Sequence, residues 1–252
     1  MFDSQLLEYF VSSLGPLLKA AVLWTIPLAV VSFMAGLVLA ILLAMMRMSH
    51  IKVFIAFAKF YSWLLRGTPL VVWLFLIFYG LPSFGIVLEP FTAGVIGLAM
   101  AEAAYSSETI RAAMQAIPKG QWEAAKAVGM TKWQMYRLVI FPQAAAIAIP
   151  NLASAFISQM KDTSLTGVLT VPELFHRGQQ ITAVIYEPML IYAEVAMIYL
   201  AINSFLSYLQ GRLEIRFRNG NLAPIENKKK EKAAANAVSY THLRAHETEA
   251  DL

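Results

Sequence analysis

Runs of about twenty mostly apolar residues recur along this chain, and an α-helix needs that length to cross the hydrocarbon core of a bilayer. Of the 252 residues, 58% are hydrophobic and only 14% are charged, which excludes an ordinary soluble domain. A membrane β-barrel would show short segments of alternating polarity, whereas these apolar runs are continuous. The sequence therefore predicts an all-α membrane protein with several spanning helices.

Five spans are expected, at about residues 16–46, 57–81, 91–113, 142–160 and 189–209. Pro27 and Gly36 interrupt the first span, so we expect it to tilt or bend. The second span must begin before Thr68, because Thr68 to Leu81 would make only about 21 Å of helix against a core of about 30 Å. The stretch Arg66–Pro69 is then a local irregularity inside that span.

The fourth span is predicted to break at Pro150–Asn151. Ala153, Ser154 and Ser158 follow this break, and such small residues let neighbouring helices approach closely. A polar connection, residues 161–188, then leads to the fifth span.

Lysines and arginines gather in alternate connections. Sixteen of them lie in the intervals 47–66, 111–137 and 212–232, whereas the opposite side holds only three, Lys19, Lys161 and Arg177. Cytoplasmic loops of membrane proteins carry an excess of these residues. The bias predicts an N-terminus outside and a C-terminus in the cytoplasm, and it places residues 117–142 on the cytoplasmic side.

The stretch Ile117–Pro142 is the longest charged and helix-prone interval between the apolar runs. Pro118 suits a first helical position, and the residues up to Val128 favour a helix. Gly129 can turn the chain with a positive φ. We therefore expect a short helix that ends at this glycine.

A second short helix is expected directly after Gly129. Thr131, with Gln134 three residues later, is a capping-box pattern that begins a helix. Trp133, Tyr136 and Ile140 are expected on one face of this helix. Two short helices that meet at a glycine would form a rigid knob, through which a soluble partner could pass force to the spans.

The same stretch resembles a family signature. Glu123-Ala124-Ala125, then Gly129, then Val139, Phe141 and Pro142 resemble the "EAA…G…I-LP" pattern of ABC importer membrane permeases, with Val139 and Phe141 in place of the commoner Ile and Leu. The similarity extends over about residues 10–215. The polar amino-acid branch of that family is indicated by Arg66-Gly67-Thr68-Pro69, Ile117-Pro118-Lys119-Gly120-Gln121 and Lys161-Asp162-Thr163-Ser164-Leu165. Its cystine permeases are suggested by Gly80-Leu81-Pro82, Phe84-Gly85-Ile86 and Val171-Pro172-Glu173-Leu174-Phe175.

This resemblance implies a type I importer (MetI-like) fold in residues 1–215, in a bacterial cytoplasmic membrane. It implies a second copy or a homologous permease as partner, two ATPase subunits that hold ATP and Mg, and an extracytoplasmic amino-acid-binding protein. Coupling to the ATPase would run through residues 117–142, with Glu123, Ala124, Ala125, Gly129 and Pro142 as its reference residues. The chain has no GxxxxGKS/T loop, so it should not bind ATP by that route.

Glu102 lies near the middle of the third span, where a charged side chain costs roughly 2.5–3.5 kcal/mol and normally faces a cavity or a partner. An amino-acid substrate needs one charge of each sign. We hypothesise that Lys161 meets the substrate carboxylate, and that Asp162 or Glu102 meets its ammonium group. The alternative is a network in which these three residues only hold helices together. Glu194, in the fifth span, is a weaker candidate for which helix packing is the simpler interpretation.

Other functions remain open at this point. An ion-coupled secondary transporter would also have buried carboxylates, but it would need no helix–glycine–helix knob and should show internal repeats. A non-transporting membrane scaffold is the other alternative. No HExxH or GxSxG motif supports an embedded enzyme, and the chain has no cysteine. We expect no catalytic residue, metal, cofactor or nucleic-acid partner in this chain.

The end of the sequence differs from the rest. Residues 216–237 form a basic tail that is expected in the cytoplasm against anionic lipid. Residues 238–252 bear no relation to what precedes them and resemble translated vector sequence, so they are excluded from the functional argument.

Overall fold

The computed structural model describes residues 4–221, and the side chains of residues 4–216. Most of the basic tail and the whole of residues 238–252 therefore lie outside the described residues. The chain divides into two units, Met1–Gln210 and Gly211–Leu252. The first unit holds the helical bundle, and every regular element between residues 4 and 221 is a helix.

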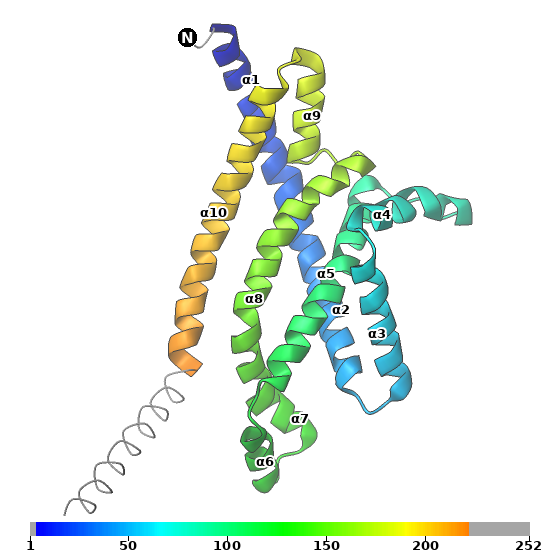
Figure 1. Cartoon of the computed structure of the whole chain (residues 1–252), viewed down its shortest axis with the longest axis vertical. Helices are drawn as coiled ribbons and strands as arrows, with labels where there is room; N and C mark the ends of the chain where they lie inside the picture. The colour runs from blue at the N-terminus through cyan, green and yellow to red at the C-terminus, as the bar shows by residue number, and fades with distance from the viewer. Residues whose placement is uncertain (1–3, 222–252) are drawn as a thin grey trace, which may run out of the picture. The chain divides into compact units, whose positions relative to one another are not determined.

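The helices follow one another with few residues between them. In chain order they are α1 (Ser4–Ala20), η1 (Ala21–Thr25), α2 (Ile26–Met48), α3 (Lys52–Gly67), α4 (Leu70–Phe75), η2 (Leu76–Gly80), η3 (Leu81–Phe84), α5 (Pro90–Gln115), α6 (Lys119–Ala127), α7 (Lys132–Met135), η4 (Tyr136–Ile140), α8 (Phe141–Asp162), η5 (Thr163–Leu169), α9 (Leu174–Ile185) and α10 (Pro188–Asn221). Within residues 4–210, α6 and α7 lie at one end of the bundle and α9 lies at the other (Figure 1).

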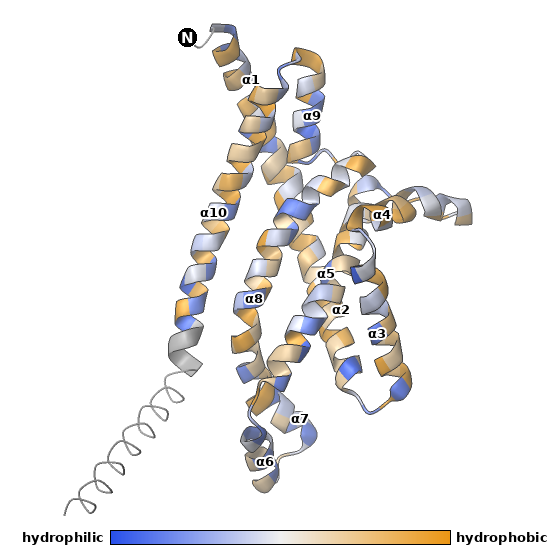
Figure 2. Ribbon diagram, viewed as in Figure 1, coloured by the Kyte–Doolittle hydropathy of each residue, from blue (hydrophilic) through white to orange (hydrophobic). Residues whose placement is uncertain are grey.

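Three stretches of the described chain are long and apolar enough to cross a membrane: Ser4–Met48, Lys132–Leu169 and Pro188–Arg216. They contain the predicted first, fourth and fifth spans. The bent pair α3–α4 is a fourth candidate. The predicted third span lies in α5, whose glycines, serines and two glutamates give it a lower hydropathy, and Figure 2 shows its mixed colouring.

The helix that contains the predicted first span begins before residue 16, because α1, η1 and α2 form one continuous stretch of 45 residues. η1 is a π-helical turn in which the Ile26 N–H donates to the carbonyl of Ala21. Pro27 follows directly. Proline lacks an N–H and its ring clashes with the carbonyl four residues earlier, so a wider turn just before it relieves the helix. The turn accommodates the proline without a break.

The second span is not one helix. We predicted a single span over residues 57–81 with a local irregularity, whereas the chain turns by 103° between α3 and the segment that begins at Leu70. Thr68 precedes Pro69, and the residue before a proline is pushed out of the helical region. Thr68 accordingly has φ −123° and ψ 141°. The irregularity is therefore a corner, and α3 alone is about 24 Å long.

α5 packs most extensively on α2, and small residues make this possible. A Cβ added at Gly36 of α2 would lie 2.8 Å from the Cβ of Glu102 and 2.9 Å from the carbonyl oxygen of Ala99. A Cβ at Gly97 would lie 2.6 Å from a methyl carbon of Leu74 in α4. These two glycines of α2 and α5 provide close helix contacts that were not predicted. On α8, Ser154 and Ser158 are exposed, and Ser154 accepts a hydrogen bond from Gln210 of α10 at 2.7 Å.

The predicted break in the fourth span is absent. α8 continues through Pro150. Two polar side chains beside the proline donate back to helix carbonyls, Asn151 Nδ2 to that of Ile147 at 3.5 Å and Ser154 Oγ to that of Pro150 at 3.3 Å. The polar connection after α8 is largely helical, because it contains η5 and α9.

Candidate functional site

The stretch between α5 and α8 forms the predicted knob. α6 ends at Ala127, and Gly129 has φ +75° as predicted. The Gly129 N–H donates to the carbonyl of Lys126 at 3.0 Å, and the Met130 N–H donates to that of Ala125 at 3.1 Å. These bonds close the end of α6 and reverse the chain. Pro118 is the residue just before α6, one position earlier than predicted.

The capping box at the start of α7 is confirmed. The Gln134 N–H donates to Thr131 Oγ1, and the Thr131 N–H donates to Gln134 Oε1. The predicted shared face is wrong: Trp133 is 66% exposed, whereas Ile140 is fully buried. The π-helical turn η4 lies between them and shifts the helical period, and Pro142 follows it as Pro27 follows η1.

A small hydrophobic core holds the knob to the bundle. Its buried members are Met114, Ile117, Ala125, Met135, Ile140 and Ala144. Trp122 packs edge-on against Tyr136 with ring centroids 5.5 Å apart. Of the five predicted coupling residues, Ala125 belongs to this core. The other four are exposed: Glu123, Ala124, Gly129 and Pro142.

A cavity of about 370 Å³ between α5 and α8 contains two of the three predicted substrate residues, Glu102 and Asp162. Glu102 is only 7% exposed. Ser106 Oγ donates to its Oε1, and the Gln159 amide, in the orientation that satisfies both of its neighbours, donates to its Oε2 at 3.1 Å while accepting from Ser32. This carboxylate is therefore held in place at the cavity wall.

Lys161 lies elsewhere. It lines a separate cavity of about 560 Å³ that also contains Phe175, Tyr192 and Tyr199. No ion pair joins Lys161, Asp162 and Glu102 in the described part of the chain. The structure thus brings Glu102 and Asp162 to one cavity and does not bring Lys161 to it.

Glu194 joins helices, as its simpler interpretation suggested. Ser13 Oγ of α1 lies 2.9 Å from its Oε1 and 2.7 Å from its Oε2, and both residues are buried. This contact ties α1 to α10 across the bundle.

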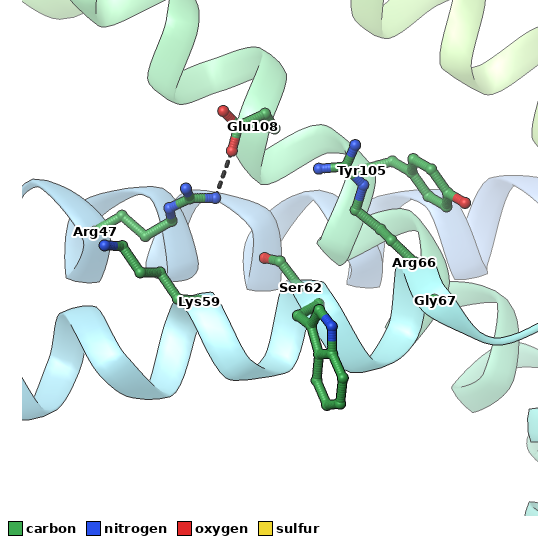
Figure 3. A pocket seen from close by; sticks show the side chains of 8 residues that line it. Arg47, Lys59, Ser62, Arg66, Gly67, Tyr105 and Glu108 are labelled. Atoms are coloured by element: carbon green, nitrogen blue, oxygen red, sulfur yellow. Dashed lines mark hydrogen bonds and ion pairs between the residues drawn. The ribbon is translucent and has the colours of Figure 1, made fainter.

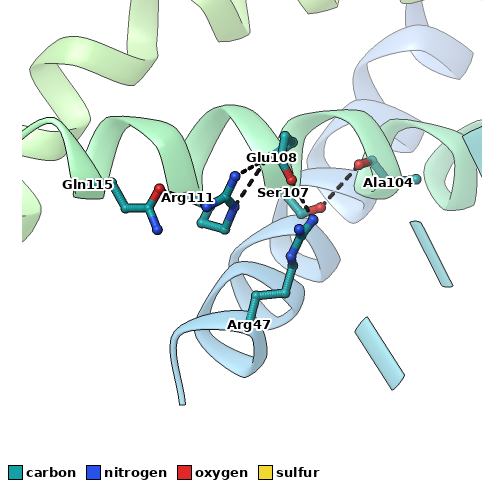
Figure 4. Close-up of polar contacts among 6 residues, drawn as sticks. All are labelled: Arg47, Ala104, Ser107, Glu108, Arg111 and Gln115. Atoms are coloured by element: carbon teal, nitrogen blue, oxygen red, sulfur yellow. Dashed lines mark hydrogen bonds and ion pairs between the residues drawn. The ribbon is translucent and has the colours of Figure 1, made fainter. Parts of the chain in front are cut away.

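We did not predict from the sequence a cluster of ion pairs around Glu108. Glu108 of α5 pairs with Arg47, the last basic residue of α2, and with Arg111 one turn later on α5 (Figure 4). Arg111 also donates to Gln115 at 2.7 Å. The spacing of Glu108 and Arg111, three residues apart on a helix, was a signal for the local pair. No sequence feature near Glu108 indicated that Arg47, which lies on another helix, would also pair with it.

We also did not identify Glu173 from the sequence as a buried residue that accepts several hydrogen bonds. It is fully buried before α9, where it accepts the N–H groups of Phe175 and His176 at 2.8 and 2.6 Å and the hydroxyl of Tyr199 at 3.0 Å. Burial raises the pKa of Glu173 to about 7, and these three hydrogen bonds oppose the rise.

Residues 36–219 match the family described as binding-protein-dependent transport system inner membrane component. The chain belongs to this family. Its relatives include the L-cystine transport system permease protein TcyB of Bacillus subtilis, 43% identical over 81% of this chain and 88% of the relative. The nopaline transport system permease protein NocM of Agrobacterium fabrum is 35% identical over 83% of this chain and 93% of that protein.

Solved structures agree with this assignment. The crystal structure of an amino acid ABC transporter with histidines matches with a TM-score of 0.77 and 35% identity, over 82% of this chain and 96% of that one. The MetNI methionine ABC transporter shares the fold, with a TM-score of 0.63 at 18% identity. The predicted resemblance, the helical MetI-like fold class and the bacterial cytoplasmic membrane as location are confirmed. The orientation of the termini stays a prediction.

Proposed function

We propose that this permease subunit belongs to an ATP-driven importer of L-cystine or another polar amino acid. The observation that carries the proposal is the α6–Gly129–α7 knob, which exposes Glu123, Ala124 and Gly129 of the family signature and is held by a core that includes Ala125. Relatives named as L-cystine permeases support the substrate class. A separate ATPase, present in two copies and holding ATP and Mg, would dock on the knob.

The same proposal includes two further partners. An extracytoplasmic amino-acid-binding protein would deliver the substrate to the end of the bundle opposite the knob. A second copy of this chain, or a homologous permease, would complete the pathway. The family description names a binding-protein-dependent system, which supports the first of these partners.

Gly129→Val should weaken ATPase docking and transport. A β-branched residue at φ +75° costs roughly 1–2 kcal/mol, so the turn between α6 and α7 would distort. Glu123→Ala removes an exposed carboxylate without disturbing the turn and is expected to have a smaller effect in the same direction. Co-purification of the ATPase and uptake of labelled amino acid would measure both.

Matched controls exist at other positions. Gly15→Val adds the same side chain where nothing lies within 4 Å of the new Cβ, and Glu89→Ala removes an exposed carboxylate remote from the knob. Normal ATPase recovery and uptake in both knob variants would contradict the proposed coupling role.

For the substrate, we propose that the ammonium group binds in the cavity of Glu102 and Asp162. Glu102→Gln should lower amino-acid affinity at least tenfold, because it removes the charge while keeping the shape of the side chain. Isothermal titration of the detergent-purified complex would measure this, with Glu194→Gln as a control that removes a buried carboxylate elsewhere. Lys161 lines a different cavity, so Lys161→Ala tests whether it contacts the substrate carboxylate as hypothesised from the sequence, and an unchanged affinity would exclude that contact. Competition between labelled cystine and other polar amino acids would assign the substrate.

A further inference from the structure

A cavity of about 520 Å³ lies between α2, α3 and α5, away from the cavity of Glu102. Four charged residues line it: Arg47, Lys59, Arg66 and Glu108 (Figure 3). They come from three helices, so the packing of the bundle, and not one run of sequence, gathers these charges. Three of the four are cations.

The charges in this cavity do not balance. Its one carboxylate, Glu108, is already paired with Arg47 inside the cavity and with Arg111 beside it. Lys59 and Arg66 have no carboxylate within ion-pair distance in the described residues. Arg66 instead lies over the Tyr105 ring, 5.5 Å from its centroid. The cavity therefore keeps an excess of positive charge.

An unsatisfied hydroxyl lines the same cavity. Ser62 of α3 is only 4% exposed, and its Oγ has no hydrogen-bond partner among residues 4–216. Figure 3 shows this hydroxyl directed from α3 toward α2. This Oγ atom is itself closed off from water, so the charge that a ligand in the cavity could reach comes from Lys59 and Arg66, which are both exposed.

The cavity borders the apolar outer surface of α3. Trp63 lines the cavity and is 69% exposed. Phe60, three residues earlier, lies against Trp63 with ring centroids 5.9 Å apart, and Phe57, one turn before Phe60, is also exposed. Tryptophan is enriched at the level of lipid headgroups. This combination of an apolar face and adjacent cations suits a ligand that is apolar at one end and anionic at the other.

We propose that this cavity binds the phosphate headgroup of an anionic phospholipid. Lys59 and Arg66 would contact the phosphate oxygens, and the acyl chains would lie along Phe57, Phe60 and Trp63. Basic pockets between spanning helices bind such headgroups. A second copy of this chain that used the same surface is a poor occupant, because the one carboxylate it would bring, Glu108, is already paired with Arg47 and Arg111.

The test uses the purified full-length protein in detergent, with phosphatidylglycerol and phosphatidylcholine added in equal amounts and bound lipid counted by native mass spectrometry. The wild type should retain phosphatidylglycerol preferentially. Lys59→Gln and Arg66→Gln should each reduce that retention about fivefold, which corresponds to about 1 kcal/mol per cation near an anionic headgroup. Lys52→Gln removes an exposed cation from the same helix, outside the cavity, and should leave it unchanged.

Three results would overturn the proposal. The first is equal retention of phosphatidylglycerol in Lys59→Gln and Lys52→Gln. The second is displacement of the lipid by an equal concentration of inorganic phosphate, which would indicate a site for a free anion. The third is a change of oligomeric state in Lys59→Gln with no change in lipid retention, which would indicate that a second copy covers the cavity. Lys59 is exposed, so its variant tests the proposal even if Arg66→Gln fails to fold.

Discussion

Replacing Gly36 with leucine is expected to separate α2 from α5 and to destabilise the bundle by about 3 kcal/mol, the upper end of what overpacking costs. The new Cβ would lie 2.9 Å from the carbonyl oxygen of Ala99 and 2.8 Å from the Cβ of Glu102. A helix backbone cannot move aside as the end of a side chain can, so the whole helix would have to shift. The Glu102 carboxylate would shift with it.

Thermal unfolding in detergent and the yield of monodisperse protein would measure this effect. Gly15→Leu is the matched control, because nothing lies within 4 Å of a Cβ at that position of α1. Because only Gly36 of these two glycines is in close contact with another helix, we expect a clear loss of stability for Gly36→Leu and none for Gly15→Leu. Equal stability of the two variants would contradict it.

The second large effect is a dependence of stability on pH through Glu173. Its pKa is about 7 in the folded protein, against an ordinary value of 4.5. Between these values the folded state keeps a proton that the unfolded state has lost. The stability from this group is therefore fully present below about pH 4.5, and it is lost as the pH rises through 7, by about 3 kcal/mol in all.

Glu173→Gln should remove this dependence, since glutamine does not titrate. The measurement is the difference in unfolding temperature between wild type and variant from pH 5 to pH 8, where the wild type should lose stability relative to Glu173→Gln. His176→Gln serves as the control, because it changes a neighbouring side chain while keeping the backbone N–H that Glu173 accepts. A parallel pH profile for wild type and Glu173→Gln would show that Glu173 is not the titrating group.

Features that depend on a few neighbouring residues could be predicted. The positive φ of Gly129 and the capping box of Thr131 and Gln134 involve bonds that span at most five residues. The positions of the three π-helical turns could also have been predicted from neighbouring residues, although we did not predict them. Each ends two residues before a proline, at Pro27, Pro82 and Pro142. The corner at Thr68–Pro69 also follows from proline sterics, but its angle does not.

The composition of the candidate substrate site could not be predicted from neighbouring residues alone. Lys161 and Asp162 are adjacent in sequence and were predicted to act together. Successive residues on a helix point about 100° apart, so neighbours at the end of α8 reach different cavities. Sequence alone did not indicate which of the two would face Glu102, because the rotation of α8 depends on its packing against α5.

Apolar run lengths, charge bias and the knob signature were enough to assign a helical permease, because each is a property of a continuous segment. The grouping of residues from separate helices required the folded bundle. Glu108 with Arg47, Glu194 with Ser13, and Gly36 against Glu102 are contacts set by how closely and at what rotation helices pack. Many packings of apolar helices satisfy the same hydrophobic pattern, so only the three-dimensional arrangement distinguishes which polar residues meet.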